Sequence, residues 1–199
     1  MNVLAFVDTH ADKKKFDAIK KKAKEADVIL CAGDLSVFEN NYEKLLKELD
    51  EIGVQTFIIH GNHETERETL LLTKNLSNVL FIHKKVIKYK DYYFFGWGGG
   101  GFNDIDSELE HKQKEFENAV KGKQYIFISH APPYNTPLDH LNGRSVGNKT
   151  IRKFIEHTQP RVAISGHIHE VAKATGKIGK SFLANPGPDG MLIKINQIP

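Results

Sequence analysis

Apolar runs of strand length recur along the whole chain and are separated by polar segments. Several of these runs are rich in β-branched and aromatic residues, which suit strands that are buried on one or both faces of a sheet. We expect them to form the core of the fold. The runs are NVLAFV (2–7), DVILC (27–31), VQTFII (54–59), YYFFGW (92–97), QYIFIS (124–129) and RVAIS (161–165).

Two segments between the early runs have the spacing of amphipathic helices. Each places its apolar residues three or four positions apart: Phe16, Ile19 and Ala23 in the first, and Tyr42, Leu45, Leu46 and Leu49 in the second. Alternation of strand and helix predicts βαβ crossovers and a largely parallel sheet through the first half. The runs VIKY (86–89), YYFFGW (92–97), KSFLA (180–184) and MLIKIN (191–196) indicate a more hairpin-like component.

The α/β pattern continues without a repeat or a low-complexity linker, so we expect residues 1–199 to form a single domain. The formal charge of +3 is the difference between 28 basic and 25 acidic side chains, which gives no clear nucleic-acid patch. The lysines of KKKFDAIKKKAK (13–24) surround an apolar stripe, and we interpret them as a solvated helix face rather than a basic patch.

Cysteine usage and the absence of a long apolar run suggest where the protein works. Cys31 is the single cysteine, so it cannot form an intrachain disulfide, and a reducing compartment fits. No run approaches the roughly 20 apolar residues of a membrane span, and the first residues lack the pattern of a signal peptide. We expect a cytoplasmic protein without a membrane partner.

Polar side chains cluster directly after five of the predicted strands. Because the ligand site of an open α/β sheet lies outside the carboxyl ends of its strands, we expect these side chains to converge. Two clusters hold pairs two positions apart, and in an extended segment that spacing sends both side chains to the same side. The clustered residues are Asp8 and His10, Asp34, Asn62 and His63, His130, and His167 and His169.

Taken singly, these residues have plainer interpretations. Asp34 alone would be the N-cap of the next helix, and His130 alone would be a partly exposed polar residue. Together, two carboxylates, an amide and four imidazoles, seven donors in all, would be costly to desolvate without a cation. Nitrogen and oxygen donors without a thiolate suit Mn, Fe, Co, Ni or Zn. Seven donors exceed the needs of one ion, so we expect two ions that share a bridging carboxylate and keep positions open for a substrate.

Two loops are further candidates for substrate contacts. The run WGGGG (97–101) follows a strand, and we interpret it as a flexible turn beside a pocket rather than a phosphate cradle, because no Lys-Ser/Thr pair and helix follow. Residues 131–146 form a long Pro-, Asn- and Gly-rich connection, a lid or a substrate wall. His140 and Arg144 in it are candidate substrate contacts, with a solvated loop as the alternative. His83, His111 and His157 lie outside these clusters and are expected at the surface.

Five short motifs occur in an order that resembles the calcineurin-like metallophosphoesterase family. They are DTH (8–10), GD (33–34), GNHE (61–64), SH (129–130) and GHIH (166–169), and the resemblance extends from Val3 to about Pro186. The stretch 129–170 and NPG (185–187) resemble a compact prokaryotic subgroup of predicted phosphoesterases. The sequence departs from the protein phosphatases, because LS follows GD. It also has Glu64 and Ser129 where many relatives carry Asp and Gly.

The resemblance implies a four-layer sandwich, two mixed β-sheets packed face to face with helices outside. It implies that Asp34 bridges two ions, that Asp8, His10 and His169 complete one site, and that Asn62, His130 and His167 complete the other. His63 would face the scissile phosphate as an acid or an electrostatic stabiliser.

The activity implied by the resemblance is hydrolysis of a small phosphorylated substrate, a nucleotide among the candidates, by a metal-bridging hydroxide. A phosphodiesterase using two divalent ions, with manganese favoured, is our leading hypothesis. The alternatives are a phosphomonoesterase or nucleotidase on the same site, a nuclease as a weaker third choice, and a non-catalytic protein-binding scaffold. The intact donor set, together with His63, argues against the scaffold.

Overall fold

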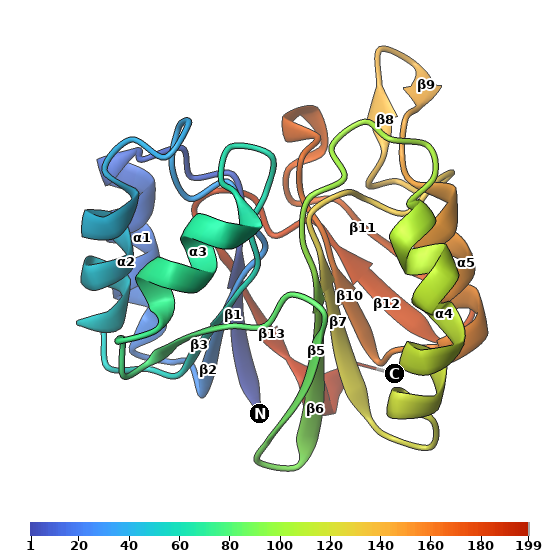
Figure 1. Cartoon of the computed structure of the whole chain (residues 1–199), viewed down its shortest axis with the longest axis horizontal. Helices are drawn as coiled ribbons and strands as arrows, with labels where there is room; N and C mark the ends of the chain where they lie inside the picture. Colours follow the sequence, from blue (N-terminus) through green and yellow to red (C-terminus); the bar gives the residue numbers. More distant parts are fainter. Residues whose placement is uncertain (199) are drawn as a thin grey trace.

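Two β-sheets pack face to face, and helices cover the outer side of each in the computed structural model, which describes residues 1–198 (Figure 1). The first sheet is parallel except for the strand at one edge, which is antiparallel to its neighbour. Its order is β13 (Met191–Lys194), β1 (Asn2–Phe6), β2 (Val28–Cys31), β3 (Thr56–Ile58) and β4 (Val79–Phe81).

The second sheet has a parallel centre and an antiparallel strand at each edge. The edge pairs include VIKY, YYFFGW and KSFLA of the predicted hairpin-like component, whereas MLIKIN forms β13 and pairs with β1 in the first sheet. Its order is β11 (Thr175–Ile178), β12 (Ser181–Ala184), β10 (Val162–Ile164), β7 (Tyr125–Ser129), β6 (Tyr92–Trp97) and β5 (Lys85–Tyr89). A short hairpin, β8 (His140–Leu141) with β9 (Arg144–Ser145), stands apart from both sheets.

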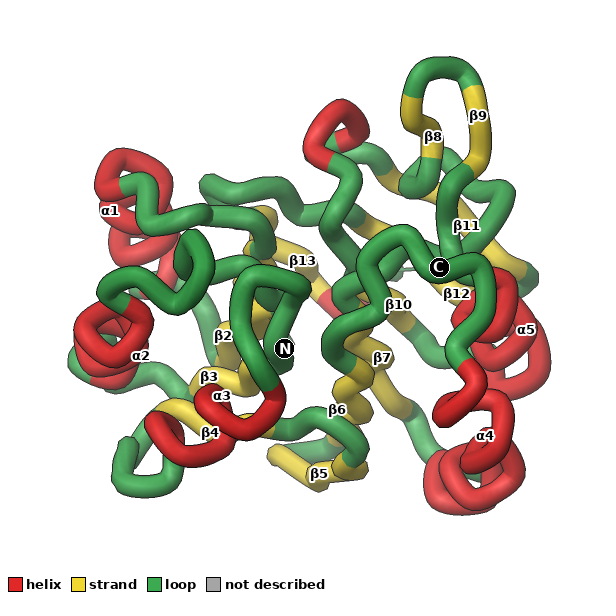
Figure 2. Tube along the Cα trace, turned by 45° about the horizontal axis from the view of Figure 1, so that its top comes forward, coloured by secondary structure: helices red, strands yellow, loops and turns green. Residues whose placement is uncertain are grey.

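The helices form the two outer layers, so the predicted four-layer sandwich is confirmed (Figures 1 and 2). The first sheet is covered by α1 (Lys13–Ala23), α2 (Tyr42–Asp50) and α3 (Glu66–Thr73), and the second by α4 (Ser107–Val120) and α5 (Lys149–Thr158). Two 3-10 turns, η1 (His169–Val171) and η2 (Ile195–Gln197), complete the elements.

The apolar core has three parts, which follow from the alternation of side chains along each strand. Along β1, Val3 and Ala5 face the second sheet, where they meet Ile126 of β7 in a core shared by both sheets. Leu4 and Phe6 face the other way and pack in a cluster that includes residues of α1 and α2. The third cluster lies between the second sheet and the pair α4 and α5.

The amphipathic segments expected at α1 and α2 are helices with the predicted residues buried. In α1 the side chains of Phe16, Ile19 and Ala23 are buried, while the Asp12 carboxylate caps the helix by accepting hydrogen bonds from the amides of Lys14 and Lys15. The lysines of this segment lie on its outer surface, partly or fully exposed.

The sequence pattern does not predict α3, α4 or β4. The reason is clearest in α3, which buries Thr69 and Thr73 and exposes Leu70 and Leu71, so its hydrophobic pattern points the wrong way. In β4 the middle residue, Leu80, is exposed and only three residues pair. Such short or inverted patterns are overridden by tertiary contacts.

The expectation that His83 lies at the surface is wrong. His83 follows β4 along the chain, and the residue is only 6% exposed. His111 and His157 are exposed as expected, and His157 lies in the last turn of α5. Within residues 1–198, no helix is both long and apolar enough to cross a lipid bilayer.

Candidate metal centre

The loops that follow five parallel strands bring the predicted donors to one edge of the molecule. These loops follow β1, β2 and β3 of the first sheet and β7 and β10 of the second. Figure 2 turns that edge forward and shows loops of both halves meeting there. The eight clustered residues that the sequence singles out are all close together in space, although they span 162 positions from Asp8 to His169, counted inclusively.

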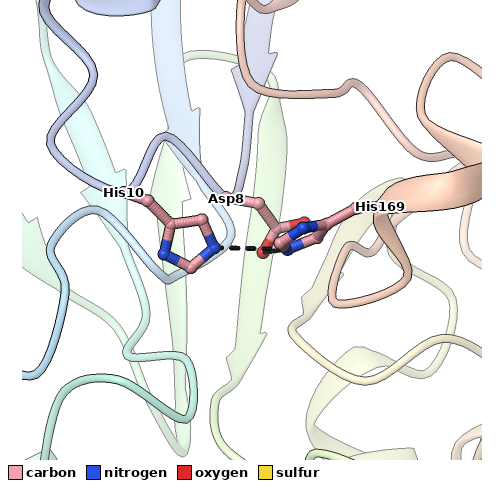
Figure 3. Close-up of side chains that lie close together, drawn as sticks. All are labelled: Asp8, His10 and His169. Carbon is pink, nitrogen blue, oxygen red and sulfur yellow. Dashed lines mark hydrogen bonds and ion pairs between the residues drawn. The ribbon is translucent and has the colours of Figure 1, made fainter.

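One group of donors is formed by Asp8, His10 and His169, whose ligand atoms lie within 4.8 Å of one another. The Nε2 atoms of His10 and His169 are 3.2 Å apart, and His169 Nε2 is 3.9 Å from Asp8 Oδ1. Figure 3 shows the two rings turned toward each other beside the Asp8 carboxylate. Three donors from two chain segments thus face one small volume.

A second group surrounds the side-chain oxygen of Asn62. His130 Nε2 is 3.0 Å and His167 Nδ1 is 2.8 Å from Asn62 Oδ1. Asp34 lies between the two groups, with its Oδ2 atom 3.5 Å from His130 Nε2 and 4.0 Å from His10 Nε2. The arrangement therefore has one central carboxylate with nitrogen and oxygen donors on both sides.

His63 also lies beside this central carboxylate. Its Nε2 atom is 3.9 Å from Asp34 Oδ2, and its backbone amide donates a 3.0 Å hydrogen bond to Asp34 Oδ1. The His63 side chain is 21% exposed. It is therefore positioned to meet both the donors and a molecule that approaches from solvent.

The expectation that each donor pair lies in an extended segment is wrong, and of the two pairs only Asp8 and His10 belong to the same group of donors. Asp8 and His10 have φ angles of 56° and 47°, and His167 has a φ of 70°, so neither pair lies in an extended segment. Asp34 also adopts a left-handed backbone, with φ 51°. This conformation is uncommon for residues other than glycine and is found at functional sites where the surrounding structure holds it in place. His167 and His169 accordingly turn to different groups of donors.

Hydrogen bonds beneath the site orient two of the imidazoles. His130 Nδ1 lies 2.9 Å from the Ala32 carbonyl oxygen, and His10 Nδ1 lies 3.3 Å from the Ser36 carbonyl oxygen. An Nδ1–H that donates to a carbonyl leaves Nε2 with a free lone pair. Both Nε2 atoms point into the donor cluster, as ligation of a cation requires.

Burial leaves polar groups of the site in an energetically unfavourable state, which a bound cation would relieve. Burial and the neighbouring negative charge of Asp34 raise the pKa of Asp8 to about 8, while burial lowers the pKa values of His10 and His130. Asp8 Oδ1 and His167 Nε2 are buried without a hydrogen-bond partner in the part of the chain that the structure describes. Such groups are costly to bury unpaired. The donor chemistry therefore fits divalent metal ions, and the two-sided arrangement fits two of them.

Glu64 supports the site from below, and sequence reasoning noted it only as a departure from Asp. Its buried carboxylate accepts hydrogen bonds from the amides of Asp34 (3.0 Å), Ser36 (2.8 Å) and Gly61 (3.1 Å). The Ser36 hydroxyl donates a fourth, 2.9 Å long. Glu64 thus ties the loop after β2 to the loop after β3. The sequence offers only an acidic residue directly after GNH, and nothing in it shows that this carboxylate is buried.

His140 and Arg144, the candidate substrate contacts, are not part of the donor cluster within residues 1–198. They are exposed on the hairpin of β8 and β9, and β8 lies beside η1, the turn that begins at His169. His140 Nδ1 is 2.8 Å from the Thr136 carbonyl oxygen. The hairpin rises at the same edge of the molecule as the site (Figure 1). A role for His140 and Arg144 in substrate contact stays a prediction.

The glycine run forms a turn that borders a cavity of about 290 Å³. Gly99, Gly100 and Gly101 have φ angles of 76°, 95° and 47°, and a Cβ atom on Gly98 would lie 2.5 Å from His60 Nδ1. A side chain at Gly98 would therefore displace the ring beneath it. The turn continues toward the site, where Gly101 lies close to the His167 ring.

A two-sheet sandwich with carboxylate, amide and imidazole donors at the strand ends defines a class of metal-dependent hydrolases that act on phosphoesters. A family model of calcineurin-like phosphoesterases matches residues 1–171, so the chain belongs to this family of dimetal-dependent enzymes. The resemblance drawn from the five motifs is confirmed.

Two of three similar proteins are covered over more than 90% of their own length, which agrees with the compact form expected from the sequence. The uncharacterized protein MJ1162 of Methanocaldococcus jannaschii is 31% identical over 205 residues, which cover 97% of this chain and 91% of its own. A probable cyclic nucleotide phosphodiesterase of Synechococcus is 25% identical over 174 residues, which cover 83% of this chain and 66% of its own. The crystal structure of TT1561 of Thermus thermophilus superposes with a TM-score of 0.79 at 18% identity, covering 100% of this chain and 96% of that chain, and supports the fold alone.

Proposed function

We propose that this protein is a phosphodiesterase with a binuclear metal centre, and that its substrate is a small phosphorylated molecule such as a nucleotide. Asp8, His10, Asp34 and His169 would hold one ion, and Asp34, Asn62, His130 and His167 would hold the other. The observation that carries the proposal is the place of the Asp34 carboxylate between two groups of donors.

When bound, the two ions lower the pKa of water and neutralise the charge of the phosphate oxygens. The chain itself orients the donors through the carbonyl groups of Ala32 and Ser36 and through the Glu64 carboxylate. The His63 imidazole, partly exposed beside Asp34, donates a proton to the leaving oxygen or stabilises its charge. Manganese is the ion we favour because of the carboxylate and amide oxygens, while the imidazoles suit Fe, Ni or Zn as alternatives.

Two further observations support two separate parts of the proposal. One concerns the choice of a diester as substrate, and the other concerns the organisation of the chain as a single domain. A relative covering 83% of this chain is named a probable cyclic nucleotide phosphodiesterase, which favours a diester over a monoester. The shared core between the sheets, with Val3 and Ile126 in one cluster, supports a single domain over residues 1–199. The monoesterase is retained as the alternative on the same site.

The test is hydrolysis of bis-p-nitrophenyl phosphate beside p-nitrophenyl phosphate, after the metal-free protein has been reloaded with manganese. We expect a higher kcat/KM for the diester. Faster turnover of the monoester would favour the alternative. Two bound ions without hydrolysis of either compound, or of a nucleotide panel, would contradict the enzyme assignment and favour the scaffold.

A further inference from the structure

Two phenylalanine side chains are exposed beside the proposed metal ligands. Phe38 is 73% exposed and Phe102 is 60% exposed, and both rings lie against histidines of the site. The centroid of Phe38 is 4.5 Å from that of His63, with 43° between the ring planes. The centroid of Phe102 is 4.3 Å from that of His167, with 65° between the planes. Large apolar groups left in water at a functional site are typical of binding surfaces.

The loop after β2 holds Phe38 in its outward position. Phe38 and Glu39 have φ angles of 46° and 63°, a conformation that is uncommon for an aromatic residue. Val37 and Asn40 pair across the turn, and Glu39 Oε1 accepts a 3.0 Å hydrogen bond from the Thr65 amide at the start of α3. The ring is therefore displayed by a closed turn that is anchored to a helix.

Phe102 is displayed by a different loop, which belongs to the second sheet. It follows the glycine turn after β6, in which the Asn103 amide donates a 3.0 Å hydrogen bond to the Gly100 carbonyl. The Asn103 carbonyl accepts a 2.7 Å hydrogen bond from Asn148 Nδ2, and the Lys149 amide donates a 2.8 Å bond to the Asp104 carbonyl. The start of α5 thus anchors this loop. Each half of the molecule contributes one ring.

We propose that Phe38 and Phe102 bind planar rings on the two ester arms of the substrate, an inference that rests on the proposed phosphodiesterase function. A phosphate at the donor cluster would lie between His63 and His167, so its two arms reach opposite rings. Phe38 adjoins His63, the proposed proton donor, and contacts the arm that leaves. Phe102 adjoins His167 and contacts the arm that stays on the phosphate. The substrate class is a phosphodiester with an aromatic group, such as a nucleobase, on each arm.

Two diesters with the same leaving group test this assignment. Bis-p-nitrophenyl phosphate has a ring on both arms, whereas methyl p-nitrophenyl phosphate has a ring on the leaving arm alone. Replacement of phenylalanine by leucine keeps an apolar side chain and removes the aromatic face. We expect Phe38→Leu to raise KM for both compounds and Phe102→Leu to raise it for the first compound only. An aromatic contact is worth a change of about 2- to 10-fold.

Leu71→Ala is the matched control, because this side chain is also 60% exposed but lies on α3. It should leave both KM values unchanged. An equal rise in KM for both diesters in Phe102→Leu would overturn the assignment of the arms. KM values in the two phenylalanine variants equal to those of the control would overturn the proposal as a whole.

A binding measurement keeps the inference separate from the proposed activity. Calorimetric titration of the manganese-loaded protein should show that diphenyl phosphate binds more tightly than dimethyl phosphate, and that either leucine variant reduces the difference. If the protein hydrolyses no diester, the proposed function fails, and this titration still decides whether the rings bind aromatic groups. Equal binding of the two compounds by the parent protein would contradict the inference.

Discussion

Two groups of histidines lie close together in this fold and have different surroundings. In the site, Nε2 of His10 faces Nε2 of His169, and Nε2 of His130 faces the Asp34 carboxylate. In the second group the rings of His60 and His83 meet at 4.6 Å, with 80° between their planes, beneath the glycine turn. Among residues 1–198, the groups of donors close enough to share an ion include neither His60 nor His83.

The surroundings of His83 explain the difference. Its Nδ1 accepts a 2.7 Å hydrogen bond from the Gly98 amide, and its Nε2 lies 3.4 Å from Glu66 Oε2. Burial lowers the pKa of His60 to about 4 and that of His83 to about 3. Burial also lowers the pKa values of His10 and His130, but only the site contains buried carboxylates that need a cation. Protonation state alone does not make a metal site; the direction of the lone pairs and the buried negative charge do.

The largest expected effect comes from Asp34→Asn, which removes the charge at the centre of the site. Because Asp34 is proposed to touch both ions, we expect metal analysis to fall from two ions per chain toward none, with activity lost. His10→Ala should lose only the ion at its own site. We expect the affinity for that ion to fall by at least the 10- to 100-fold that follows loss of a supporting contact. Loss of the same single ion in both variants would contradict the bridging role.

His63→Asn should separate catalysis from metal binding. We expect both ions to remain and kcat to fall by about 10²- to 10⁴-fold for an alkoxide leaving group, since general acid catalysis contributes that much. A nitrophenolate leaving group needs less proton assistance and should show a smaller loss. Release of an ion would make His63 a ligand, and full activity with both leaving groups would exclude the acid role.

His83→Leu should lower stability without touching the metal centre. The Gly98 amide would lose its acceptor in a buried place, which costs about 1–3 kcal/mol of unfolding free energy. Denaturant titration measures this loss, and metal analysis should still find two ions per chain. His157→Leu is the matched control, since its imidazole is exposed at the end of α5, and it should change stability little. Loss of an ion in His83→Leu would remove the distinction between the two groups.

The smallest expected effect is on the pH dependence of stability. The pKa of His83 is about 3 in the folded protein against an ordinary value of 6.5, so the unfolded chain takes up its proton first as the pH falls. The stability that the neutral His83 side chain provides is therefore fully present above pH 6.5 and is lost as the pH falls toward 3. His83→Leu should reduce the slope of unfolding free energy between about pH 6 and pH 4 by up to about 1.4 kcal/mol per pH unit. An unchanged slope would mean that His83 is already protonated in the folded protein.

The sequence predicts most strands of the sheets and the convergence of the clustered polar residues, because both depend on patterns that survive without knowledge of distant contacts. Apolar runs such as 2–7 and 124–129 become buried strands, and parallel strands must end at a common edge. Donors after those strands, such as Asp34 and His130, therefore meet. The same reasoning fails for α3, where two of the three leucines, Leu70 and Leu71, are exposed and only Leu72 packs against the core.

Other features depend on contacts between segments far apart in the chain, and the tertiary structure alone decides them. His83 and Glu64 look like ordinary polar residues in sequence, and both are buried because distant backbone groups, the amides of Gly98 and Ser36, supply their hydrogen bonds. The exposed rings of Phe38 and Phe102 show the reverse, since local sequence would place phenylalanine in a core. Residue type and periodicity determined the buried strands, the helices α1 and α2, and which donors are present. Packing between the two sheets and their loops determined which polar groups are paired, which atoms face the site, and which apolar rings are left for a ligand.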